Sequence, residues 1–396
     1  MDKHKVLFLI SMMNGGGAER VIGILASEFA ENGYDATLML TNQRLEDAVR
    51  YDVSGKVKFV SLLDVEADVS GTEKLRYKLA KPYTRVFGTA CEKLKIKTPD
   101  HIARDTFMWQ NYAKVDALRK YLSDKPDTDI IVFLQPSVNI ALLATANLPN
   151  RVILSERLDP ARYGRNRYMP YFAKEWYPKA YGLVFQTHNA QSYFPENVVK
   201  KSKVIYNPLN PALPAAYSGS RKKTVVNFCR ITEQKNLPLL VDAFELFCEK
   251  HPDYDLEIWG SGDAENSVKE YIGKSPIKEK ITLKPFSPKL HETIREYAMF
   301  VSSSDYEGMS NSMLEALAIG LPSVCTDCPA GGAAAIINDH ENGILVPVKD
   351  KQAMCNAMFE IAEDEALAGK LSQNAAKLAE ELSVHNIARQ WMEMLD

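Results

Sequence analysis

The feature that most constrains the fold is an alternation of short apolar runs with helical segments, which recurs along the whole chain. In the first half, the runs that predict strands cover residues 5–12, 36–41, 57–62, 130–134, 152–155 and 182–186. In the second half they cover residues 225–229, 256–259, 281–283, 298–302, 323–326 and 344–346. Strands that alternate with helices favour parallel sheets with helices on both faces. We therefore predict an α/β fold with two doubly wound domains that face a cleft.

A segment rich in proline and glycine separates the two series of strands. Residues 207–223 contain three prolines and the run Ser218-Gly219-Ser220, which is a composition typical of linkers. We expect one domain at 1–213 and a second at 214–375. The remaining residues, 376–396, are expected to form a helix that crosses back to the first domain, because Ile387, Trp391 and Leu395 share one face.

Composition excludes several classes of protein. No apolar run reaches the roughly 18 residues of a membrane-spanning helix, and Val6–Ile10 is short for the apolar core of a signal peptide. The six cysteines are scattered apart from Cys325 and Cys328, which alone do not complete a zinc site. Reduced thiols indicate a cytoplasmic protein. A slightly acidic chain with no nucleic-acid-binding motif argues against nucleic-acid partners.

The first chemistry-bearing motif is Gly15-Gly16-Gly17, directly after the first predicted strand and at the start of a helix. Glycines let backbone N–H groups approach an anion closely, and the helix N-terminus adds partial positive charge. The spacing does not match the dinucleotide fingerprint. A tight strand-to-helix turn is the alternative, but such a turn needs one glycine and not three.

Two further motifs follow strands of the second half. Arg230 and Lys235 occupy a loop after one strand and are candidates to bind a diphosphate, although a solvated basic loop would have the same sequence. Glu307 follows a later strand, beside Gly308, and Glu315 lies in the next helix. Carboxylates there can accept hydrogen bonds from sugar hydroxyls. The alternative for Glu315 is a capping box with Ser312.

These three motifs, in this order along the chain, resemble the retaining glycosyltransferases of family 4, which have the GT-B fold of two Rossmann-like domains. The resemblance implies that Arg230 and Lys235 hold the diphosphate of a nucleotide sugar and that Glu307 holds the transferred sugar. These three residues are expected to be catalytic. It implies that Glu315 binds the ribose. The remaining donor contacts implied are Gly16, Gly17, Gly308, Met309, Ser310 and Asn311. The family needs no metal and no further cofactor.

The sequence departs from the family at two places. Many members have a histidine after a Ser-Glu pair in the first domain, where this chain has Arg157 after Glu156. Arginine cannot act as a base at neutral pH, but it can bind phosphate or acceptor oxygens. We therefore group Gly15, Glu156 and Arg157 as acceptor or phosphate contacts. A glutamate that is common after Gly331-Gly332 is replaced by the run 333–335 of alanines.

Asp127-Thr128-Asp129 superficially matches the D-x-D of metal-dependent transferases. It stands before its strand and not at the end where ligands bind, so we interpret it as a turn and predict no metal site.

The first half is basic and the second is acidic. Residues 1–213 carry 30 Lys and Arg against 23 Asp and Glu, whereas the rest carry 18 against 28. The basic residues concentrate in 74–97 and 162–179, where aromatic and aliphatic residues interleave with them. Such segments suit an anionic membrane surface, and a solvated helix face with its aromatics in the core is the alternative.

We therefore predict a retaining enzyme that moves a hexose or N-acetylhexosamine from a nucleotide sugar to a glycan or lipid-linked acceptor in surface polysaccharide or glycolipid synthesis. A UDP-sugar is favoured, with a GDP-sugar as the alternative, and the expected location is the cytoplasm at the inner face of the plasma membrane. Base contacts are expected near Lys284-Pro285-Phe286. A sugar-nucleotide 2-epimerase and a non-catalytic nucleotide-sugar-binding protein are the alternatives.

Overall fold

The chain forms two compact units, which are described separately below. The structure, a computed structural model, describes residues 3–49, 53–94, 96, 98–157, 159–165, 168–287 and 289–396. Unit 1 comprises residues 1–205 and 388–396, and unit 2 comprises residues 206–387. The division falls after Ile205, earlier than the expected Leu213, because the next residues pack on unit 2. There the amide of Leu209 donates to the carbonyl of Leu382 at 2.9 Å.

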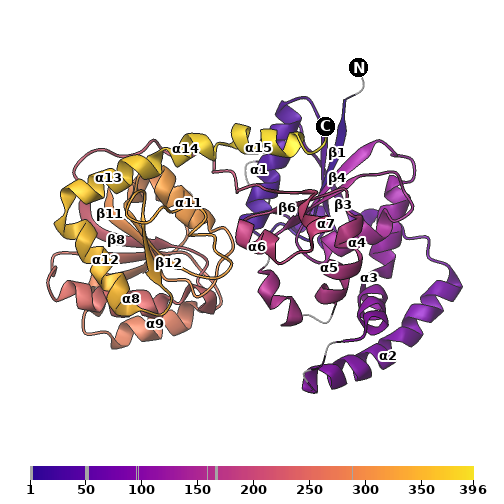
Figure 1. The fold of residues 1–396 in the computed structure, drawn as a ribbon, viewed down its shortest axis with the longest axis horizontal. Helices are drawn as coiled ribbons and strands as arrows, with labels where there is room; N and C mark the ends of the chain where they lie inside the picture. Colours follow the sequence, from indigo (N-terminus) through magenta and orange to yellow (C-terminus); the bar gives the residue numbers. More distant parts are fainter. Residues whose placement is uncertain are drawn as a thin grey trace. The chain divides into compact units, whose positions relative to one another are not determined.

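Unit 1 is built on a parallel seven-stranded sheet of order β3-β2-β1-β4-β5-β6-β7 (Figure 1). Its strands are β1 Lys5–Ile10, β2 Asp35–Leu40, β3 Lys58–Ser61, β4 Thr128–Phe133, β5 Val152–Glu156, β6 Gly182–Phe185 and β7 Ser202–Val204. Its helices are α1 Gly17–Glu31, α2 Gly71–Lys93, α3 Asp100–Leu122, α4 Ser137–Ala144, α5 Met169–Glu175, α6 His188–Ser192 and α7 Glu196–Val199.

Both faces of this sheet are covered, as its apolar strands require. Leu7 and Leu9 of β1 belong to the same core cluster as residues of α3, α4 and α5. Phe8, which points to the opposite face, packs edge-on against Phe29 of α1 at 5.2 Å between ring centroids. The alternation of side chains along a strand explains this division of neighbouring residues between two layers.

Unit 2 is built on a parallel six-stranded sheet of order β10-β9-β8-β11-β12-β13. Its strands are β8 Lys222–Phe228, β9 Asp255–Trp259, β10 Ile281–Lys284, β11 Tyr297–Ser302, β12 Ser323–Asp327 and β13 Ile344–Pro347. Helices α8, α9 and α12 pack together on one face, and α11, α13 and α14 pack together on the other (Figure 1). The helices are α8 Leu237–Cys248, α9 Glu265–Lys274, α10 Leu290–Ile294, α11 Asn311–Ala318, α12 Lys351–Glu363, α13 Glu365–Ala376 and α14 Leu378–Glu381.

The last helix, α15 (Val384–Met392), leads from unit 2 into unit 1. Trp391 is 1% exposed and lies 5.7 Å from the ring of Phe133 in unit 1, and the carbonyl of Leu395 accepts from Arg151 at 2.6 Å. Only the final nine residues belong to unit 1, because α13 and α14 pack on α11 of unit 2. The part of the C-terminal segment that belongs to unit 1 is therefore 388–396, which is shorter than the expected 376–396.

Candidate functional site

The residues predicted from the second half lie at the carboxyl edge of the unit 2 sheet, where its strand order reverses. Strands β8 and β11 are neighbours there, and the chain leaves them toward opposite sides of the sheet. Doubly wound sheets bind ligands in the crevice at this point, outside the carboxyl ends of the strands. The loop after β8 carries Arg230 and Lys235, and the loop after β11 carries Glu307.

Lys235 and Glu307 form a largely buried ion pair across these two loops. The Lys235 Nζ lies 2.5 Å from Oε2 of Glu307, and the two side chains are 15% and 21% exposed. The same Oε2 also accepts from Gln234 Nε2 at 3.2 Å and Ser304 Oγ at 3.5 Å. Within the described part of the chain, no donor reaches Oε1. One oxygen is thus fixed by three donors, while the other is available to a hydroxyl group.

Hydrogen bonds between the loops hold this pair in register. Asn236 adopts a left-handed conformation (φ 42°), which asparagine tolerates better than most residues, and its side chain donates to Asp305 at 2.8 Å. The Ser303 hydroxyl donates to the carbonyl of Lys235 at 2.8 Å. The amide of Asp305 donates to the carbonyl of Gln234 at 3.0 Å. The two loops therefore behave as one rigid support.

The charge state of Lys235 follows from two opposing effects. Burial alone would lower the pKa of Lys235, but the adjacent Glu307 carboxylate more than offsets this and holds that pKa above its usual value. Burial also raises the pKa of the neighbouring Cys229 thiol to about 11. The site thus keeps a permanent cation next to a neutral thiol at physiological pH.

Arg230 differs from Lys235 in its surroundings. Its side chain is exposed, and no ion pair or hydrogen bond joins it to another residue that the structure describes. The structure therefore brings Lys235 and Glu307 together, whereas the side chain of Arg230, on the same loop as Lys235, is exposed.

The loop between Glu307 and α11 presents backbone amides. Ser310 is the N-cap of α11, and its hydroxyl accepts from the amide of Met313 at 3.4 Å. Among the described residues, the amides of Gly308, Met309 and Ser310 donate to no protein acceptor. Unsatisfied amides at a helix N-terminus bind anions and hydroxyl oxygens.

Asn311, the last residue of this predicted loop, is held by a residue that the sequence did not indicate. Its Oδ1 accepts from Nδ2 of Asn207 at 2.7 Å, and that Nδ2 also lies 3.4 Å from the carbonyl of Met309. Asn207 is 3% exposed. It fastens the start of α11 to the segment that follows β7.

Glu315 is 4% exposed on α11 and pairs with a histidine. Its Oε2 lies 2.9 Å from His291 Nε2, on α10, and the ring of Phe228 lies edge-on to that histidine at 5.5 Å. The capping-box interpretation is wrong, because α11 begins after Ser310 and not after Ser312. His291 was not predicted from the sequence.

A third loop, after β12, packs against the Glu307 loop. The amide of Glu307 donates to the carbonyl of Pro329 at 2.7 Å, and the amide of Ala330 donates back to Glu307 at 3.2 Å. A Cβ on Gly332 would stand 1.6 Å from the carbonyl oxygen of Gly308. Only glycine fits this close approach. The alanines at 333–335 follow directly, so no carboxylate is available there.

The glycine loop of unit 1 has its amides occupied by the chain itself. Gly15 has φ 93°, and Gly16 is the N-cap of α1. The carboxylate of Glu19 accepts from the amides of Asn14 at 2.5 Å and Gly16 at 2.8 Å. Two amides at this loop therefore bind a carboxylate of the chain's own helix α1.

Glu156 and Arg157 lie at the carboxyl end of β5, and both are engaged within unit 1. Glu156 accepts hydrogen bonds from the hydroxyls of Tyr163 and, at 2.9 Å, Tyr177. Burial, reinforced by this carboxylate, raises the pKa of both tyrosines well above the usual value. The guanidinium of Arg157 stacks 3.9 Å from the ring centroid of Phe133, and burial lowers the pKa of Arg157 to about 9. The arginine is thus held against the sheet.

Asp129 serves a structural purpose at the amino end of β4. Its carboxylate receives Arg151 in a bidentate pair (2.6 and 2.8 Å) and His4 at 2.7 Å. Over the described ranges, no group of three or more His, Cys, Asp or Glu residues is arranged to hold a metal ion.

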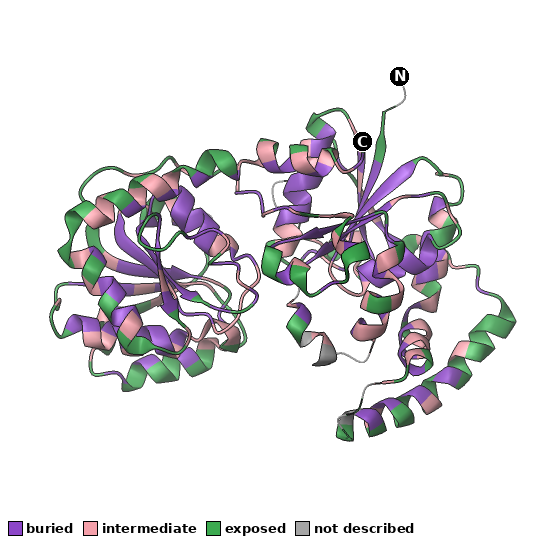
Figure 2. Cartoon of the chain, viewed as in Figure 1, coloured by how far each residue is buried: buried purple, intermediate pink, exposed green. Residues whose placement is uncertain are grey.

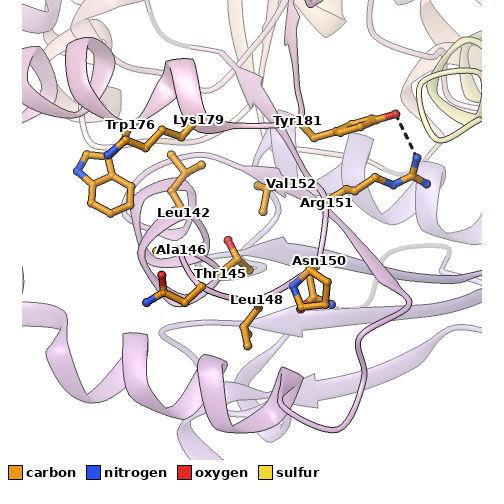
Figure 3. Close-up of a pocket in the computed structure, with 12 residues that line it drawn as sticks. Leu142, Thr145, Ala146, Leu148, Asn150, Arg151, Val152, Trp176, Lys179 and Tyr181 are labelled. Atoms are coloured by element: carbon orange, nitrogen blue, oxygen red, sulfur yellow. Dashed lines mark hydrogen bonds between the residues drawn. The ribbon is translucent and has the colours of Figure 1, made fainter.

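Two surface pockets lie away from the predicted residues. One, of about 630 Å³, lies at the amino ends of β5 and β6 and is lined by Arg151, Trp176, Lys179 and Tyr181 among others (Figure 3). The other, of about 490 Å³, lies in unit 2. It is lined by Tyr206 and by residues from the segments 335–342 and 374–382. None of the residues predicted from the sequence to contact ligand lines either pocket.

In the second basic and aromatic segment, 162–179, the described aromatic rings pack in the core, which is the alternative stated for it. Phe172 and Tyr177 are fully buried, and Tyr168, Tyr171 and Trp176 pack against the same core. These rings contribute to the core of unit 1 because the short helix α5 lies on α3. Residues 166–167 and the side chains of Arg162 and Arg165 lie outside the described residues.

Comparison with known proteins identifies the class of the second unit. A sequence model of the family "Glycosyl transferases group 1" matches residues 216–378. The matched segment covers most of unit 2, which is thus similar to the domain of that family. The poly(glycerol-phosphate) alpha-glucosyltransferase of Bacillus subtilis is 29% identical over 187 residues, which are 47% of this chain and 27% of that protein. An uncharacterized glycosyltransferase of Haemophilus influenzae is 21% identical over 391 residues, 98% of each chain.

A third relative is the N-acetylgalactosamine-N,N'-diacetylbacillosaminyl-diphospho-undecaprenol 4-alpha-N-acetylgalactosaminyltransferase of Campylobacter jejuni. It is 26% identical over 282 residues, 68% of this chain and 76% of the relative. The chain therefore spans between about a quarter and nearly all of the length of these relatives.

Solved structures match over the whole chain. TarM of S. aureus superposes with a TM-score of 0.74 at 13% identity, over 100% of this chain and 99% of TarM. Anabaena Alr3699/HepE, solved in complex with UDP, gives 0.73 at 18% identity over 99% of both chains. These findings confirm the expected GT-B fold, and with the family domain they support the expected transferase enzyme.

Proposed function

We propose that this chain is a family 4 glycosyltransferase that moves a hexose or N-acetylhexosamine from a UDP-sugar to a glycan or lipid-linked acceptor with retention of anomeric configuration. The observation that carries the proposal is the buried pair of Lys235 and Glu307 at the strand-order reversal of unit 2. A cation and an oriented carboxylate at that point match what a nucleotide sugar presents, which is a diphosphate joined to a polyhydroxylated ring.

The proposed chemistry assigns one task to each group. Negative charge grows on the departing nucleoside diphosphate, and Lys235 stabilises it together with the exposed Arg230. The amides of Gly308, Met309 and Ser310 donate to phosphate or sugar oxygens. Glu307 accepts a sugar hydroxyl through Oε1, since Oε2 is already held by protein donors. Preorganised donors of this kind typically contribute about 3–4 kcal/mol each to lowering a barrier.

Glu315 is proposed to bind the ribose hydroxyls of the donor. Its position one helix turn and more beyond the amide-rich loop suits a nucleoside that continues from the diphosphate. His291 holds one of its carboxylate oxygens at 2.9 Å. A buried carboxylate needs such a partner, and a carboxylate can accept hydrogen bonds from hydroxyl groups.

The choice of donor and acceptor rests on the relatives. HepE was solved with UDP, and the Bacillus and Campylobacter proteins are named for a phosphate polymer and a diphospho-undecaprenol glycan. We infer a UDP-sugar donor and an acceptor of surface polysaccharide or glycolipid assembly. The reaction is proposed to be independent of metals and cofactors and to take place in the cytoplasm.

The test begins with ligand-induced stabilisation. UDP-, GDP- and ADP-sugars are compared by thermal shift, because a ligand at about 100 times its dissociation constant adds about 2.7 kcal/mol of stability. The best donor is then incubated with candidate acceptors in the presence of EDTA, and the anomeric configuration of the product is read by NMR. An inverted product, or activity that EDTA abolishes, would contradict the mechanism. Stabilisation by none of the three donors would contradict the function.

A nucleotide-sugar-binding protein without turnover is the second candidate. Arg157 favours it, because an arginine held against Phe133 and hydrogen-bonded to Ser155 replaces the histidine common in the family. Release of UDP on adding acceptor separates the two candidates. An epimerase of the same fold would instead convert the donor with no acceptor present.

A further inference from the structure

Helix α2 (Gly71–Lys93) packs on α3 through small residues and the rings of Tyr77 and Tyr83, and it faces outward with large aliphatic residues. Ala80, Thr84 and Cys91 are 5%, 0% and 7% exposed, on the side that packs on α3. On the opposite side, Leu79 and Val86 are 64% and 68% exposed. An ordinary surface helix has the reverse arrangement, with its apolar stripe toward the core.

The outward apolar residues form one stripe, which is called the α2 stripe below. They recur at intervals of four, three, four and four residues: Leu75, Leu79, Pro82, Val86 and Ala90, all exposed. This spacing places them in a single line along the helix. Of the twelve large hydrophobic residues that are exposed in the described part of the chain, six fall between Leu75 and Ile96. A contiguous exposed apolar surface of this kind marks an interaction site.

A row of cations runs along one side of the stripe. Lys74, Lys78, Lys81 and Arg85 each precede one of the first four residues of the stripe by one position. All four are exposed, and the salt bridges of the described residues include none of them. Lys81 lies 5.2 Å from the ring of Trp109. Packing two copies of this face together would bring like charges close, so an anionic partner is favoured over a second copy.

The helix is shaped to lie on a surface. Its 23 residues extend for about 34 Å, and in Figure 1 it is the outermost element of unit 1, with α3 behind it. Figure 2 shows its outer side as a nearly continuous exposed band. No helix in the described chain is long and apolar enough to cross a membrane. Apolar residues beside a basic row suit a helix that lies in the plane of the headgroups.

We propose that α2 docks unit 1 on an anionic lipid bilayer. The α2 stripe inserts at the level of the headgroups, and Lys74, Lys78, Lys81 and Arg85 bind lipid phosphates. The inference does not depend on sugar transfer, since it concerns a surface outside the donor site and is tested with no nucleotide sugar present. Lys95 and Lys97, which belong to the same basic segment of the sequence, lie outside the described residues.

The experiment is co-sedimentation of the full chain with phosphatidylcholine vesicles that contain or lack phosphatidylglycerol. The protein is expected to sediment with the anionic vesicles at an ionic strength of about 0.1 M and to be released at about 1 M, where the screening length falls to about 3 Å. Replacing two cations by Lys78→Gln and Arg85→Gln should weaken binding about 25-fold, since each basic residue contributes roughly fivefold.

Two further variants separate insertion from charge. Leu79→Glu with Val86→Glu interrupts the stripe without touching the core, and it should abolish sedimentation with the anionic vesicles. The matched control is Leu63→Glu, which changes an exposed leucine of the same unit (46% exposed) and should bind like the wild type. Circular dichroism checks that each variant is folded.

Two outcomes would overturn the proposal. One is a folded wild-type protein that stays in the supernatant with anionic vesicles at low salt. The other is a dimer, detected by light scattering, that Leu79→Glu with Val86→Glu dissociates while vesicle binding is absent or unchanged. In that case the α2 stripe is a surface for a second copy of the chain.

Discussion

Replacing Lys235 by methionine should inactivate the enzyme while leaving it folded. Methionine has a similar length and no charge, so the substitution removes the cation and keeps most of the packing. Lys235 is the group of the site that directly contacts the Glu307 carboxylate, at 2.5 Å. Loss of one preorganised charge of this kind typically lowers kcat by about 10²–10³-fold, or about 2.7–4 kcal/mol. We expect a loss in kcat/KM within that range.

The cost in stability should be smaller than the cost in activity. Breaking a fully buried ion pair costs about 3–5 kcal/mol, because the remaining charge stays uncompensated. Here Glu307 is 21% exposed and keeps its hydrogen bonds from Gln234 and Ser304. We therefore expect about 1–3 kcal/mol, in line with the loss of one hydrogen-bonded partner. A stable domain tolerates this loss.

The same substitution has a defined pH dependence. Because the folded pKa of Lys235 is above its usual value of 10.5, its contribution to stability is fully present below that value. The contribution is lost as the pH rises through the folded pKa. The difference in Tm between wild type and Lys235→Met should be constant across neutral pH and shrink in strongly alkaline buffer.

The assay is a progress curve of UDP release with saturating acceptor, accompanied by calorimetric titration of UDP and thermal unfolding. Lys223→Met is the matched control, since Lys223 pairs with Asp253 on the surface of the same unit and should be silent in all three measurements. A folded Lys235→Met protein with the wild-type rate and UDP affinity would refute the assignment of the donor site to these loops.

Two other predictions concern the support of the site. His291→Gln should raise the dissociation constant of UDP by about tenfold with little change in kcat. This corresponds to a loss of about 1.4 kcal/mol in binding, because Glu315 is no longer held in position. Equal losses of UDP affinity in Glu315→Gln and in the double variant, measured by calorimetry, would confirm that the two residues act together. Gly332→Ala should destabilise the protein by about 1–3 kcal/mol and impair donor binding, because the added Cβ meets the Gly308 carbonyl. Gly369→Ala is the control: it lies in a helix with no atom within 4 Å of the added Cβ, and it should stabilise the protein by about 0.5–1 kcal/mol in thermal unfolding. The opposite order of stabilities would be inconsistent with the loop packing described.

Much of the fold follows from the sequence because buried parallel strands are nearly continuous apolar runs. All twelve predicted strands are present within a few residues, and the carboxyl-edge rule is enough to place the loops of Lys235 and Glu307 together. The strand that was missed, β7 (Ser202–Val204), lies at the sheet edge. It has three residues of which none is buried, so it lacks the apolar signal.

The partners of the site residues could not be predicted in the same way. His291, on α10, contacts Glu315, on α11. Asn207, the first residue of the predicted linker, donates to Asn311. Neither pair has a spacing rule. The cap of α11 was a choice between two serines of the same loop, and only the geometry of the helix start decides it.

Composition also could not tell the two basic, aromatic-rich segments apart. In residues 169–179 the rings fill the core of unit 1, whereas in α2 the large apolar residues point away from it. Both segments contain similar residue types. In α2 the side that packs on α3 is occupied by small residues and by the rings of Tyr77 and Tyr83, and the large aliphatic residues lie on the opposite side.

The two glycine-bearing loops differ in a way that favours unit 2 for the proposed donor phosphates. In unit 1 the amides of Asn14 and Gly16 already bind the Glu19 carboxylate. A phosphate at these amides must therefore first displace that carboxylate, which is part of the same chain. In unit 2 the amides of Gly308, Met309 and Ser310 donate to no acceptor among the described residues, and Lys235 supplies a cation on the adjoining loop. An anion therefore gains donors in unit 2 without losing an existing interaction. The proposed diphosphate site rests on this asymmetry, and Glu19→Gln should accordingly leave UDP affinity close to that of the wild type.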